Sequence, residues 1–411
     1  MTRALMISYC FPPLKYPRSI QISRVLRYLS LPFTMITAEP GSDSLSGVDP
    51  TIPWPGPAHA DSTIRLLPSS ASTRRTVEAL ARWRLLSLVQ PDPFRFWAME
   101  AAHAIDTQGL SAQHDVLLSF GQPMSDHLAA WAVKRRTGIP WIAHFSDPWK
   151  RNAFRTGHVL SRLMDPSYEK KVLRDADHLI FTSEESRALV LDGYPGGYLA
   201  KASVLPHAYD PDLYGTAAPA RDGKRRLVHV GNFYGHRTPD PFLKGVAHLA
   251  AHRPRALDGL ELHFYGHVED EVRARALRYD LGAATLQFHG SVPYLESLRK
   301  MKEADGLLLV DADADQSPFL PSKLVDYLGA ARPIFGVTPP GTSANLLHSL
   351  GDRQVSPRDP ESVARELELF LSETAPRTRD PGILAQFDAR QIARELGQIM
   401  ERVSHAHRLK H

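Results

Sequence analysis

The sequence has little cysteine and no long apolar run. Cys10 is the only cysteine among 411 residues, so the chain cannot form an internal disulfide, which suits a reducing compartment. Its apolar runs, such as 306–310, are far shorter than the roughly 20 residues that a membrane-spanning helix needs. Residues 1–9 indicate a first strand, not a basic segment with an apolar core and a cleavage site, so we expect no secretion signal. These features together predict a cytoplasmic protein.

An excess of charge of either sign is also lacking. The chain carries 49 Lys and Arg against 45 Asp and Glu, a net charge of +4. This surplus is too small to indicate a nucleic-acid partner, and no basic and aromatic binding motif accompanies it. The sequence also contains no Gly-x-Ser-x-Gly, Cys-x-x-Cys or Gly-x4-Gly-Lys-Ser/Thr motif. The 43% apolar and 23% charged residues are typical of a globular protein.

Short apolar runs alternate with longer amphipathic segments, twice, each time over about 170 to 200 residues, which predicts α/β domains with parallel sheets. We expect strands at 4–9, 33–38, 116–120, 141–145, 178–183 and 203–206, and then at 227–233, 260–265, 286–292, 306–312 and 333–337. Helices are expected at 19–28, 125–136, 162–175, 241–252, 269–281 and 295–303. The predicted fold class is two doubly wound, Rossmann-like domains facing a cleft, with ligands beyond the carboxyl ends of the strands.

Glycine and proline mark the expected domain boundary. Residues 208–224 contain Pro211, Gly215, Pro219 and Gly223 and show no apolar period, so they predict an interdomain linker. The first domain then covers 1–207 and the second 225–385. A final helix within 386–411 is expected to pack back on the first domain.

The most informative segment is 318–336. A loop with Pro321, Ser322 and Lys323 leads into a short apolar helix and then, through Gly329, into a strand. A helix that opens with Ser and Lys directs backbone N–H groups and a cation at one place, which suits a phosphate.

Other candidate residues follow predicted strands. Lys15 and Arg18 lie in a proline-rich loop after the first strand. His144, Asp147 and Trp149 end the strand at 141–145, where Asp147 could bind a hydroxyl and Trp149 could stack on a sugar. The alternatives are a core histidine, a helix N-cap at Asp147, and an ordinary connection after the first strand.

The second predicted domain opens with a similar strand end. Gly231 is followed by Arg237, whose guanidinium could hold two phosphate oxygens; the alternative is a surface arginine. Tyr265 and Gly266 end another strand.

In order and spacing these motifs resemble the family 4 glycosyltransferases, from Phe11-Pro12-Pro13 to the final helix and most strongly at 318–336. The resemblance implies the two-domain GT-B architecture and transfer of a sugar from a nucleoside diphosphate donor, UDP or GDP, to an acceptor hydroxyl. It implies retention at the anomeric carbon, without metal or cofactor. The first domain would bind the acceptor and the second the nucleotide sugar.

The resemblance also implies roles for particular residues. Asp326 would bind the ribose, and fixed positive charge would hold the leaving diphosphate. The donor-binding set is Gly231, Arg237, Tyr265, Gly266, Ser322, Lys323 and Asp326. The acceptor-binding set is Lys15, Arg18 and Trp149, and the catalytic pair is His144 and Asp147.

The chain departs from the family pattern at four places. Pro318 stands where the family has a first glutamate, Asp326 where it has a second, Tyr16-Pro17 where glycines are usual, and Asn232 where an arginine is usual. A nucleotide-sugar epimerase and a non-catalytic sugar-binding or scaffolding relative therefore remain alternatives.

Three alternating aspartates, Asp311, Asp313 and Asp315, raise the question of a metal. Gln316 and Ser322 stand where a calcium loop needs Gly and Glu. An Asp-x-Asp metal site of the other large glycosyltransferase fold would require a single domain. Solvated loop carboxylates are the favoured interpretation.

Residues 74–89 predict a basic amphipathic helix containing one tryptophan. Such a helix can lie on an anionic membrane surface, although a core-facing helix explains the same pattern and is slightly favoured. Membrane contact would suit a lipid-linked acceptor and would place the protein at the inner face of the membrane. The expected acceptor is a glycan or a lipid-linked molecule of polysaccharide, lipopolysaccharide or glycolipid synthesis.

Overall fold

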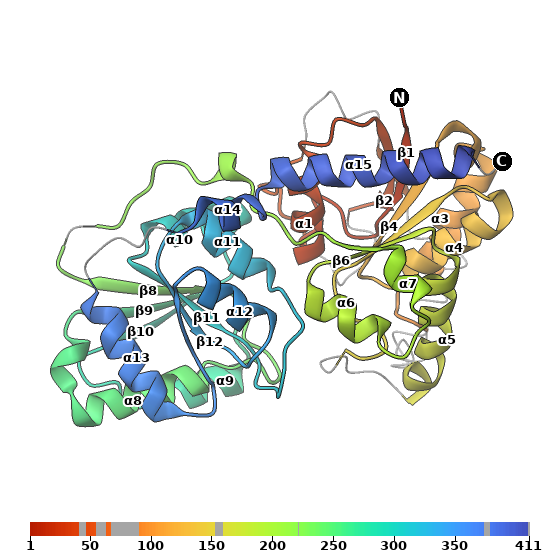
Figure 1. Ribbon diagram of the computed structural model, residues 1–411. Coiled ribbons are helices and arrows are strands. Elements are labelled where there is room, and N and C mark those ends of the chain that lie inside the picture. Colours follow the sequence, from red (N-terminus) through yellow and green to blue (C-terminus); the bar gives the residue numbers. More distant parts are fainter. Residues whose placement is uncertain are drawn as a thin grey trace. The chain divides into compact units, whose positions relative to one another are not determined.

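The computed structural model describes all residues except 41–46, 55–62, 67–89, 153–158, 221, 374–378 and 410–411. Residues Met1–Pro206 and Ala389–His411 form one compact unit, unit 1, and His207–Asp388 form a second, unit 2. Each unit has a parallel sheet with helices on its faces (Figure 1). The predicted fold class, two doubly wound α/β domains, is thus confirmed. Within the described part of the chain, no helix combines the length and the apolar character that a membrane crossing needs.

Unit 1 is built on a seven-stranded sheet in the order β3-β2-β1-β4-β5-β6-β7. Its strands are β1 (Ala4–Ile7), β2 (Phe33–Ala38), β3 (Thr63–Leu66), β4 (Val116–Gly121), β5 (Trp141–Phe145), β6 (His178–Phe181) and β7 (Ala202–Val204). Its helices are α1 (Pro17–Leu26), α3 (Arg95–Thr107), α4 (Ser125–Thr137), α5 (Val159–Asp175), α6 (Glu184–Leu191), α7 (Gly197–Ala200) and α15 (Ala389–Arg408), with a 3-10 turn at Leu110–Gln113.

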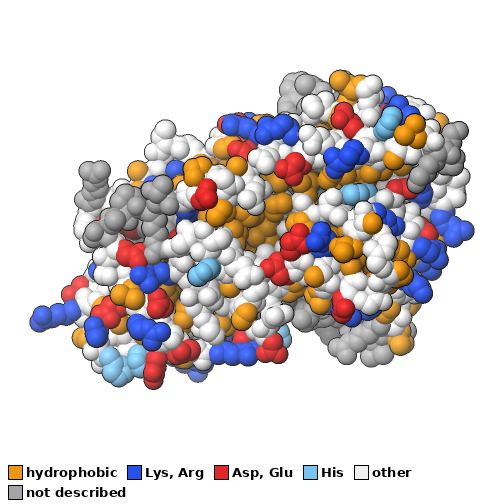
Figure 2. Space-filling model, viewed as in Figure 1, with side chains coloured by type: hydrophobic (Ala, Val, Ile, Leu, Met, Phe, Trp, Pro, Cys, Tyr) orange, Lys and Arg blue, Asp and Glu red, His pale blue; other side chains and the backbone are white. Residues whose placement is uncertain are grey.

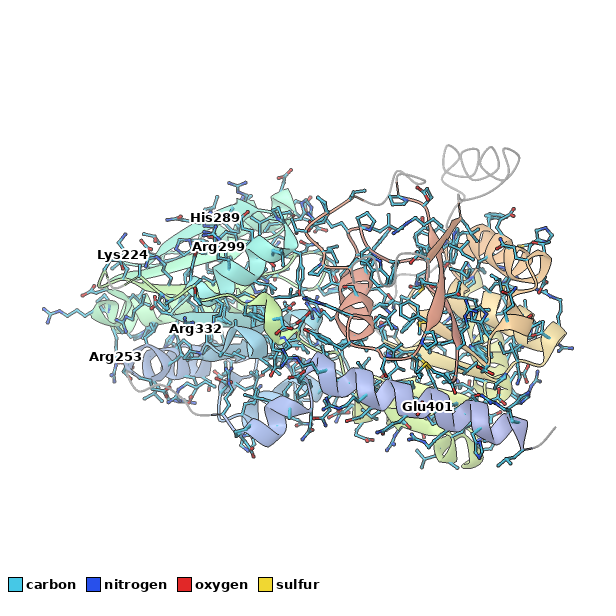
Figure 3. The ribbon with its side chains drawn as sticks, turned by 90° about the horizontal axis from the view of Figure 1, so that it is seen from above. Lys224, Arg253, His289, Arg299, Arg332 and Glu401 are labelled. Atoms are coloured by element: carbon cyan, nitrogen blue, oxygen red, sulfur yellow. The ribbon has the colours of Figure 1, made fainter. Side chains whose placement is uncertain are left out.

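The central strands of unit 1 are apolar on both faces because helices cover both. Leu5 and Ile7 of β1 belong to the core that includes Val133 of α4. The last helix, α15, packs against α1, β4 and β5. Its apolar stripe, which includes Leu396 and Met400, is buried, while Glu401, labelled in Figure 3, lies on the exposed side. The end of the chain therefore completes the unit that its beginning starts.

Unit 2 has a six-stranded parallel sheet in the order β10-β9-β8-β11-β12-β13. Its strands are β8 (Arg225–Val230), β9 (Leu260–Tyr265), β10 (Thr285–Gly290), β11 (Gly306–Val310), β12 (Ile334–Val337) and β13 (Arg353–Val355). Its helices are α8 (Asp240–His252), α9 (Asp270–Ala276), α10 (Tyr294–Glu303), α11 (Ser322–Ala330), α12 (Thr342–Ser349), α13 (Pro360–Ser372) and α14 (Pro381–Ala385), with 3-10 turns at Pro211–Leu213 and Pro254–Leu257.

Close helix packing in unit 2 depends on glycine. Helices α8 and α13 pack together, and a Cβ atom at Gly245 of α8 would lie 2.2 Å from Cγ1 of Val363. Phe242 and Val246 flank this contact in the core. The absence of a side chain at position 245 therefore sets how closely the two helices approach.

The segment expected to be a linker, 208–224, is instead part of unit 2. Tyr214 is buried, and its hydroxyl donates a hydrogen bond to the backbone oxygen of Asp326 in α11 at 3.0 Å. Gly329 of the same helix leaves room for the tyrosine ring, 2.3 Å from where its Cβ would be. Proline and glycine in this segment mark an irregular path along the domain surface, not a free connection.

Candidate functional site

Two glycines leave bare backbone at neighbouring strand ends of unit 2. Gly231 follows β8 and Gly266 follows β9, with φ angles of 144° and 139° that favour glycine. A Cβ atom at Gly266 would lie 2.2 Å from the carbonyl oxygen of Gly231. The amide of Gly231 donates a hydrogen bond to the carbonyl oxygen of Tyr265, and the amide of Gly266 donates one to the carbonyl oxygen of Gly290. The close approach of the two main chains at these strand ends therefore requires glycine at position 266.

Two cations and one carboxylate lie beside this glycine edge. Lys323, the second residue of α11, passes 3.3 Å from the Cβ position of Gly231, and its Nζ donates to the carbonyl oxygen of Val310 at 3.0 Å. Nη2 of Arg237 lies 3.9 Å from Oδ1 of Asp311. Arg237 Nε and Asp311 Oδ1 are buried and have no hydrogen-bond partner among the described residues. The cluster therefore holds a net positive charge with unused hydrogen-bonding capacity.

The charges in this cluster perturb one another. Burial of the ammonium, together with the nearby Arg237 cation, lowers the pKa of Lys323 to about 7, against the opposing effect of Asp311. An anion placed between the two cations would favour the charged form of Lys323. The arrangement is thus suited to an anionic ligand.

His229 of β8 is a member of the cluster that the sequence reasoning missed. It is fully buried, and its Nδ1 lies 2.9 Å from the carbonyl oxygen of Leu308, so Nδ1 donates. Burial and the Lys323 charge keep its pKa well below the usual range. Its Nε2 is an acceptor without a partner among the described residues and lies 3.5 Å from the Cβ position of Gly231. A histidine two positions before a strand-end glycine was the available signal.

Asp311 corrects the expectation of three solvated carboxylates. It is 4% exposed, and its Oδ2 accepts a hydrogen bond from Ser343 of α12 at 2.8 Å. Asp313 and Asp315 are exposed, as expected, and both pair with Arg358. Alternation alone could not distinguish the first aspartate, which directly follows a buried strand, from the other two. No group of three or more metal-ligating side chains occurs among the residues that the structure describes.

Asp326 lies on the first turns of α11, where two tyrosines face its carboxylate. The residue is 6% exposed, and Oδ1 lies 3.4 Å from the hydroxyls of both Tyr214 and Tyr294. Ser322 is the first residue of this helix and follows Pro321, which offers no side-chain cap. The carboxylate is thus held by neighbours from two other segments of the same unit.

Tyr265 belongs to an aromatic column on the β9–β10 side of the sheet. Its ring stacks on that of His289 at 4.3 Å, and His289, labelled in Figure 3, is exposed on β10. His289 in turn shares a 2.9 Å nitrogen–nitrogen contact with His263. The stack holds Tyr265 beside the Gly266 edge.

In unit 1, the structure brings together Arg18, His144 and Asp147. Nη2 of Arg18 lies 2.9 Å from Nδ1 of His144, and the guanidinium stands 5.3 Å above the ring of Phe120. Burial lowers the pKa of Arg18 to about 10, opposed chiefly by the negative charge of Asp147. The chain follows a bend at Asp147 and no helix begins there, so the N-cap alternative is wrong.

Trp149 is not placed as predicted. Its side chain is fully buried, and its indole Nε1 donates to Asp165 of α5 at 2.9 Å, so neither ring face is open to a sugar. The next residue, Lys150, donates its amide to Glu169, and burial raises the pKa of that carboxyl group. These contacts anchor the loop that carries Asp147. Lys15, by contrast, is exposed.

Two further polar residues of unit 1, Asp126 and His127, are fully buried. Asp126 of α4 accepts the amide of Tyr9 at 2.9 Å, and burial raises the pKa of its carboxyl group. His127 contacts the hydroxyl of Ser119 through Nδ1, and its pKa falls to about 3 through burial and the Arg18 charge. Adjacent Asp and His at a predicted helix start were visible in the sequence, but their burial was not.

The expected membrane-facing helix at 74–89 lies outside the described residues. Other basic side chains gather where α4 and α5 meet the surface, at the right of Figure 2. Two basic residues in the last turn of α4 pair with carboxylates, in Lys134–Asp177 and Arg136–Asp106. We assign no ligand to this surface.

Comparison with known proteins shows what the fold resembles. Residues 56–208 match the family described as "Glycosyl transferase 4-like domain". The chain is similar to Anabaena Alr3699/HepE in complex with UDP and glucose, with 12% identity, a TM-score of 0.66, and 98% of this chain and 100% of that chain covered. The chain is also similar to sucrose-phosphate synthase (tll1590) from Thermosynechococcus elongatus, with 16% identity, a TM-score of 0.68, and 99% of this chain and 100% of that chain covered.

The lipopolysaccharide outer core galactosyltransferase WaaB, in its apo form, gives 12% identity, a TM-score of 0.59, and coverage of 98% of this chain and 99% of that chain. No curated protein sequence matches the chain. At these identities the likeness shows the fold alone, which is the two-domain GT-B fold of glycosyltransferases.

Proposed function

We propose that the protein is a glycosyltransferase that moves a sugar from a nucleoside diphosphate sugar to an acceptor hydroxyl, with retention at the anomeric carbon. The observation that carries this proposal is the charged cluster at the Gly231 strand end, where Lys323 lies against Gly231 and the charges of Arg237 and Asp311 both act on Lys323. One buried carboxylate, Asp311, faces two cations there, so the cluster carries a net positive charge that favours an anionic diphosphate. The GT-B fold and the match at 56–208 support the same activity.

The donor-binding residues would each take one part of the nucleotide sugar. Arg237 and Lys323, with the N-terminus of α11 at Ser322, would hold the diphosphate. Asp326, whose Oδ1 lies within reach of the Tyr214 and Tyr294 hydroxyls, is the residue that we propose for the ribose. When the bond between the anomeric carbon and the diphosphate oxygen breaks, negative charge grows on that oxygen. Cations already in place stabilise this charge without reorganisation, so the residues present supply the stabilisation that the reaction needs.

The acceptor would be bound by unit 1. Arg18, His144 and Asp147 form its polar cluster at the carboxyl ends of the strands, and Lys15 lies exposed in the loop before Arg18. In this assignment Asp147 binds or deprotonates the attacking hydroxyl. Trp149 takes no part because it is buried.

For the donor base, UDP is the first choice and GDP the second. Anabaena Alr3699/HepE has been solved with UDP, with UDP and glucose, and with UDP-glucose. The acceptor class that we propose is a glycan or a lipid-linked glycan of cell-surface polysaccharide, lipopolysaccharide or glycolipid synthesis. A lipid-linked acceptor would bring the protein to the inner face of the cytoplasmic membrane.

Nucleotide binding tests the assignment of the donor site. Isothermal titration with UDP and GDP is expected to detect binding to the wild type, and Arg237→Ala and Lys323→Ala should each weaken it by at least about 1.4 kcal/mol, one order of magnitude. Arg253→Ala is the matched control, because Arg253, labelled in Figure 3, is an exposed cation that pairs with Glu368 and not with a residue of the cluster. Unchanged affinity in both cluster variants would refute the donor site.

Turnover distinguishes transfer from the alternative activities. Incubation of the wild type with UDP-glucose or GDP-mannose and a mixture of glycan acceptors is expected to release the nucleoside diphosphate and to give a product whose anomeric configuration, read by proton NMR, matches the donor. Formation of an epimeric nucleotide sugar without acceptor would indicate an epimerase instead. If the protein binds no nucleoside diphosphate, a non-catalytic relative is favoured. Pro318, which stands where the family has a glutamate, is the reason for testing this alternative.

A further inference from the structure

The guanidinium of Arg18 is fixed on three sides. Arg18 lies in the first turn of α1 and is 6% exposed. Nη2 contacts Nδ1 of His144 at 2.9 Å, and Nη1 donates to Oε1 of Gln21 at 3.2 Å. The guanidinium stands over the ring of Phe120, the β4 residue that pairs with His144 of β5. Its plane and its direction toward His144 are therefore both determined.

The chemistry of this contact allows one arrangement of protons. Arginine carries five N–H donors and no acceptor, so at 2.9 Å the Nδ1 atom of His144 must be the acceptor. A neutral imidazole has one donor and one acceptor nitrogen. With Nδ1 accepting, the proton lies on Nε2.

Another buried histidine of unit 1 shows that this arrangement is not a general property of the fold. Nδ1 of His114 lies 2.7 Å from the carbonyl oxygen of Leu110. A carbonyl oxygen can only accept, so in His114 the proton lies on Nδ1. The two side chains are thus held in opposite tautomers by opposite kinds of partner.

We propose that Arg18 is a positioning residue that holds His144 as its Nε2–H tautomer, so that His144 acts as a hydrogen-bond donor through Nε2 and not as a general base. This rests on the proposed function, which places His144 among the residues that act on the substrates. The inference goes beyond the proposed function because it assigns which nitrogen of His144 donates a hydrogen bond and which accepts one.

The assignment follows from how both ring nitrogens are used. Nδ1 is occupied by the Arg18 donor, and Nε2 already carries a proton, so neither can accept one from a substrate. A second proton on the ring would place an N–H against the guanidinium, cation against cation. Asp147, whose charge acts on the same guanidinium, is then the group of this cluster that is able to accept a proton. Asp126 and the Cys10 thiol also act electrostatically on Arg18, and the Asp126 carboxylate accepts the amide of Tyr9.

The test reads the tautomer directly. In the wild type labelled with 15N-histidine, long-range proton–nitrogen spectra at neutral pH are expected to give His144 a protonated Nε2 and a pyridine-like Nδ1. His114 should show the reverse pattern and serves as the internal reference. Assignment uses the loss of one signal set in His144→Gln. A wild-type His144 with its proton on Nδ1 would overturn the proposal without any variant.

Arg18→Met then removes the donor while keeping an unbranched apolar chain over Phe120. We expect the His144 signals to move to an Nδ1–H or mixed pattern, while the His114 pattern stays unchanged and reports an intact fold. If Arg18→Met does not fold, Arg18→Lys replaces it, and it should retain the Nε2–H pattern because the ammonium also donates. An unchanged His144 tautomer in a folded Arg18→Met protein would contradict the role of Arg18.

Kinetics complete the test once a donor and an acceptor are known. Arg18→Met is expected to lower kcat by about tenfold or more through misplacement of the His144 donor, with a smaller change in KM for the nucleotide sugar. Loss of nucleotide binding in the wild type would refute the proposed function but would leave the tautomer measurement intact. A mixed tautomer in a fully active wild type would refute the inference alone.

Discussion

The charge of Lys323 depends on its surroundings. Burial of its ammonium, and then the nearby Arg237 cation, lower its pKa to about 7, so near neutral pH the free protein holds this lysine partly deprotonated. A bound diphosphate would restore the proton, because an adjacent anion favours the charged form. Ligand binding and proton uptake at this residue are therefore linked.

This linkage predicts that UDP-glucose affinity falls as the pH rises. Lys323 is charged below about pH 7 and loses its proton above it, so affinity should be greatest at pH 6 and weaken toward pH 8. UDP-glucose is the suitable probe because its diphosphate has no group that titrates in this range. Titrations in buffers of different ionisation enthalpy should show proton uptake at neutral pH.

Lys323→Arg provides the control for this prediction, since a guanidinium stays charged throughout. Its UDP-glucose affinity should vary little between pH 6 and pH 8. An equally steep decline in Lys323→Arg would assign the pH dependence to another group.

At the scale of helices and strands, two glycines in helices appear equivalent in the sequence but differ in their surroundings. Gly245 of α8 lies against Val363, which is 2.2 Å from where a Cβ would be, whereas at Gly397 of α15 the nearest atom is Cδ1 of Leu29 at 3.6 Å. The first distance is far below van der Waals contact and the second is an ordinary one. The two positions should therefore respond to alanine in opposite directions.

We predict that Gly245→Ala lowers the free energy of unfolding by about 1–3 kcal/mol through overpacking of α8 against α13. Gly397→Ala should raise it by about 0.5–1 kcal/mol, because alanine favours the helix. Urea denaturation followed by circular dichroism measures both. A destabilised Gly397→Ala protein, or an unaffected Gly245→Ala protein, would show that helix packing differs from that described.

Elements with strong local patterns could be predicted from the sequence, and those defined by distant contacts could not. β4 and β5 were predicted almost to the residue, because strands buried on both faces are continuous apolar runs. β13 (Arg353–Val355) was missed, since three residues, two of them half-buried, give no readable pattern. β3 (Thr63–Leu66), half-buried along its whole length, was missed for the same reason.

The candidate sites show the same limit. Gly231 and Lys323 could be proposed because each ends or begins an element, and those positions are recognisable locally. The contact between Arg18 and His144 joins residues 126 positions apart, so no local pattern could reveal it. Trp149 was assigned to a sugar because an aromatic residue after a strand end looks the same whether it faces solvent or core. The hydrogen bond from its indole Nε1 to Asp165 shows that the side chain faces the core.

At the scale of the whole molecule, the two units should respond differently to a nucleotide. The donor residues all belong to unit 2, so we predict that UDP slows amide hydrogen exchange in 231–237 and 311–323. A UDP concentration of about one hundred times Kd should stabilise the ligand-bound unit by about 2.7 kcal/mol. Mass spectrometry of peptides from the intact chain locates the protection.

The Lys323→Ala variant is the comparison for this experiment, and its protection at the same UDP concentration should be much reduced. Peptides of the unit 1 strands should change little in either protein. Protection confined to unit 1 would place the nucleotide in the wrong unit and contradict the donor assignment.

The position of α15 has a consequence for how the protein is made. Unit 1 receives its covering helix from residues 389–408, after the whole of His207–Asp388 has been synthesised. Those 182 residues (388 − 206) take about 10 to 40 s to translate at roughly 5–20 residues per second. For that time the side of β4 and β5 that α15 will cover stays open on the nascent chain, while unit 2 emerges entire. Unit 2 can therefore finish folding before unit 1, because α15, which follows unit 2 in the sequence, supplies the covering helix of unit 1.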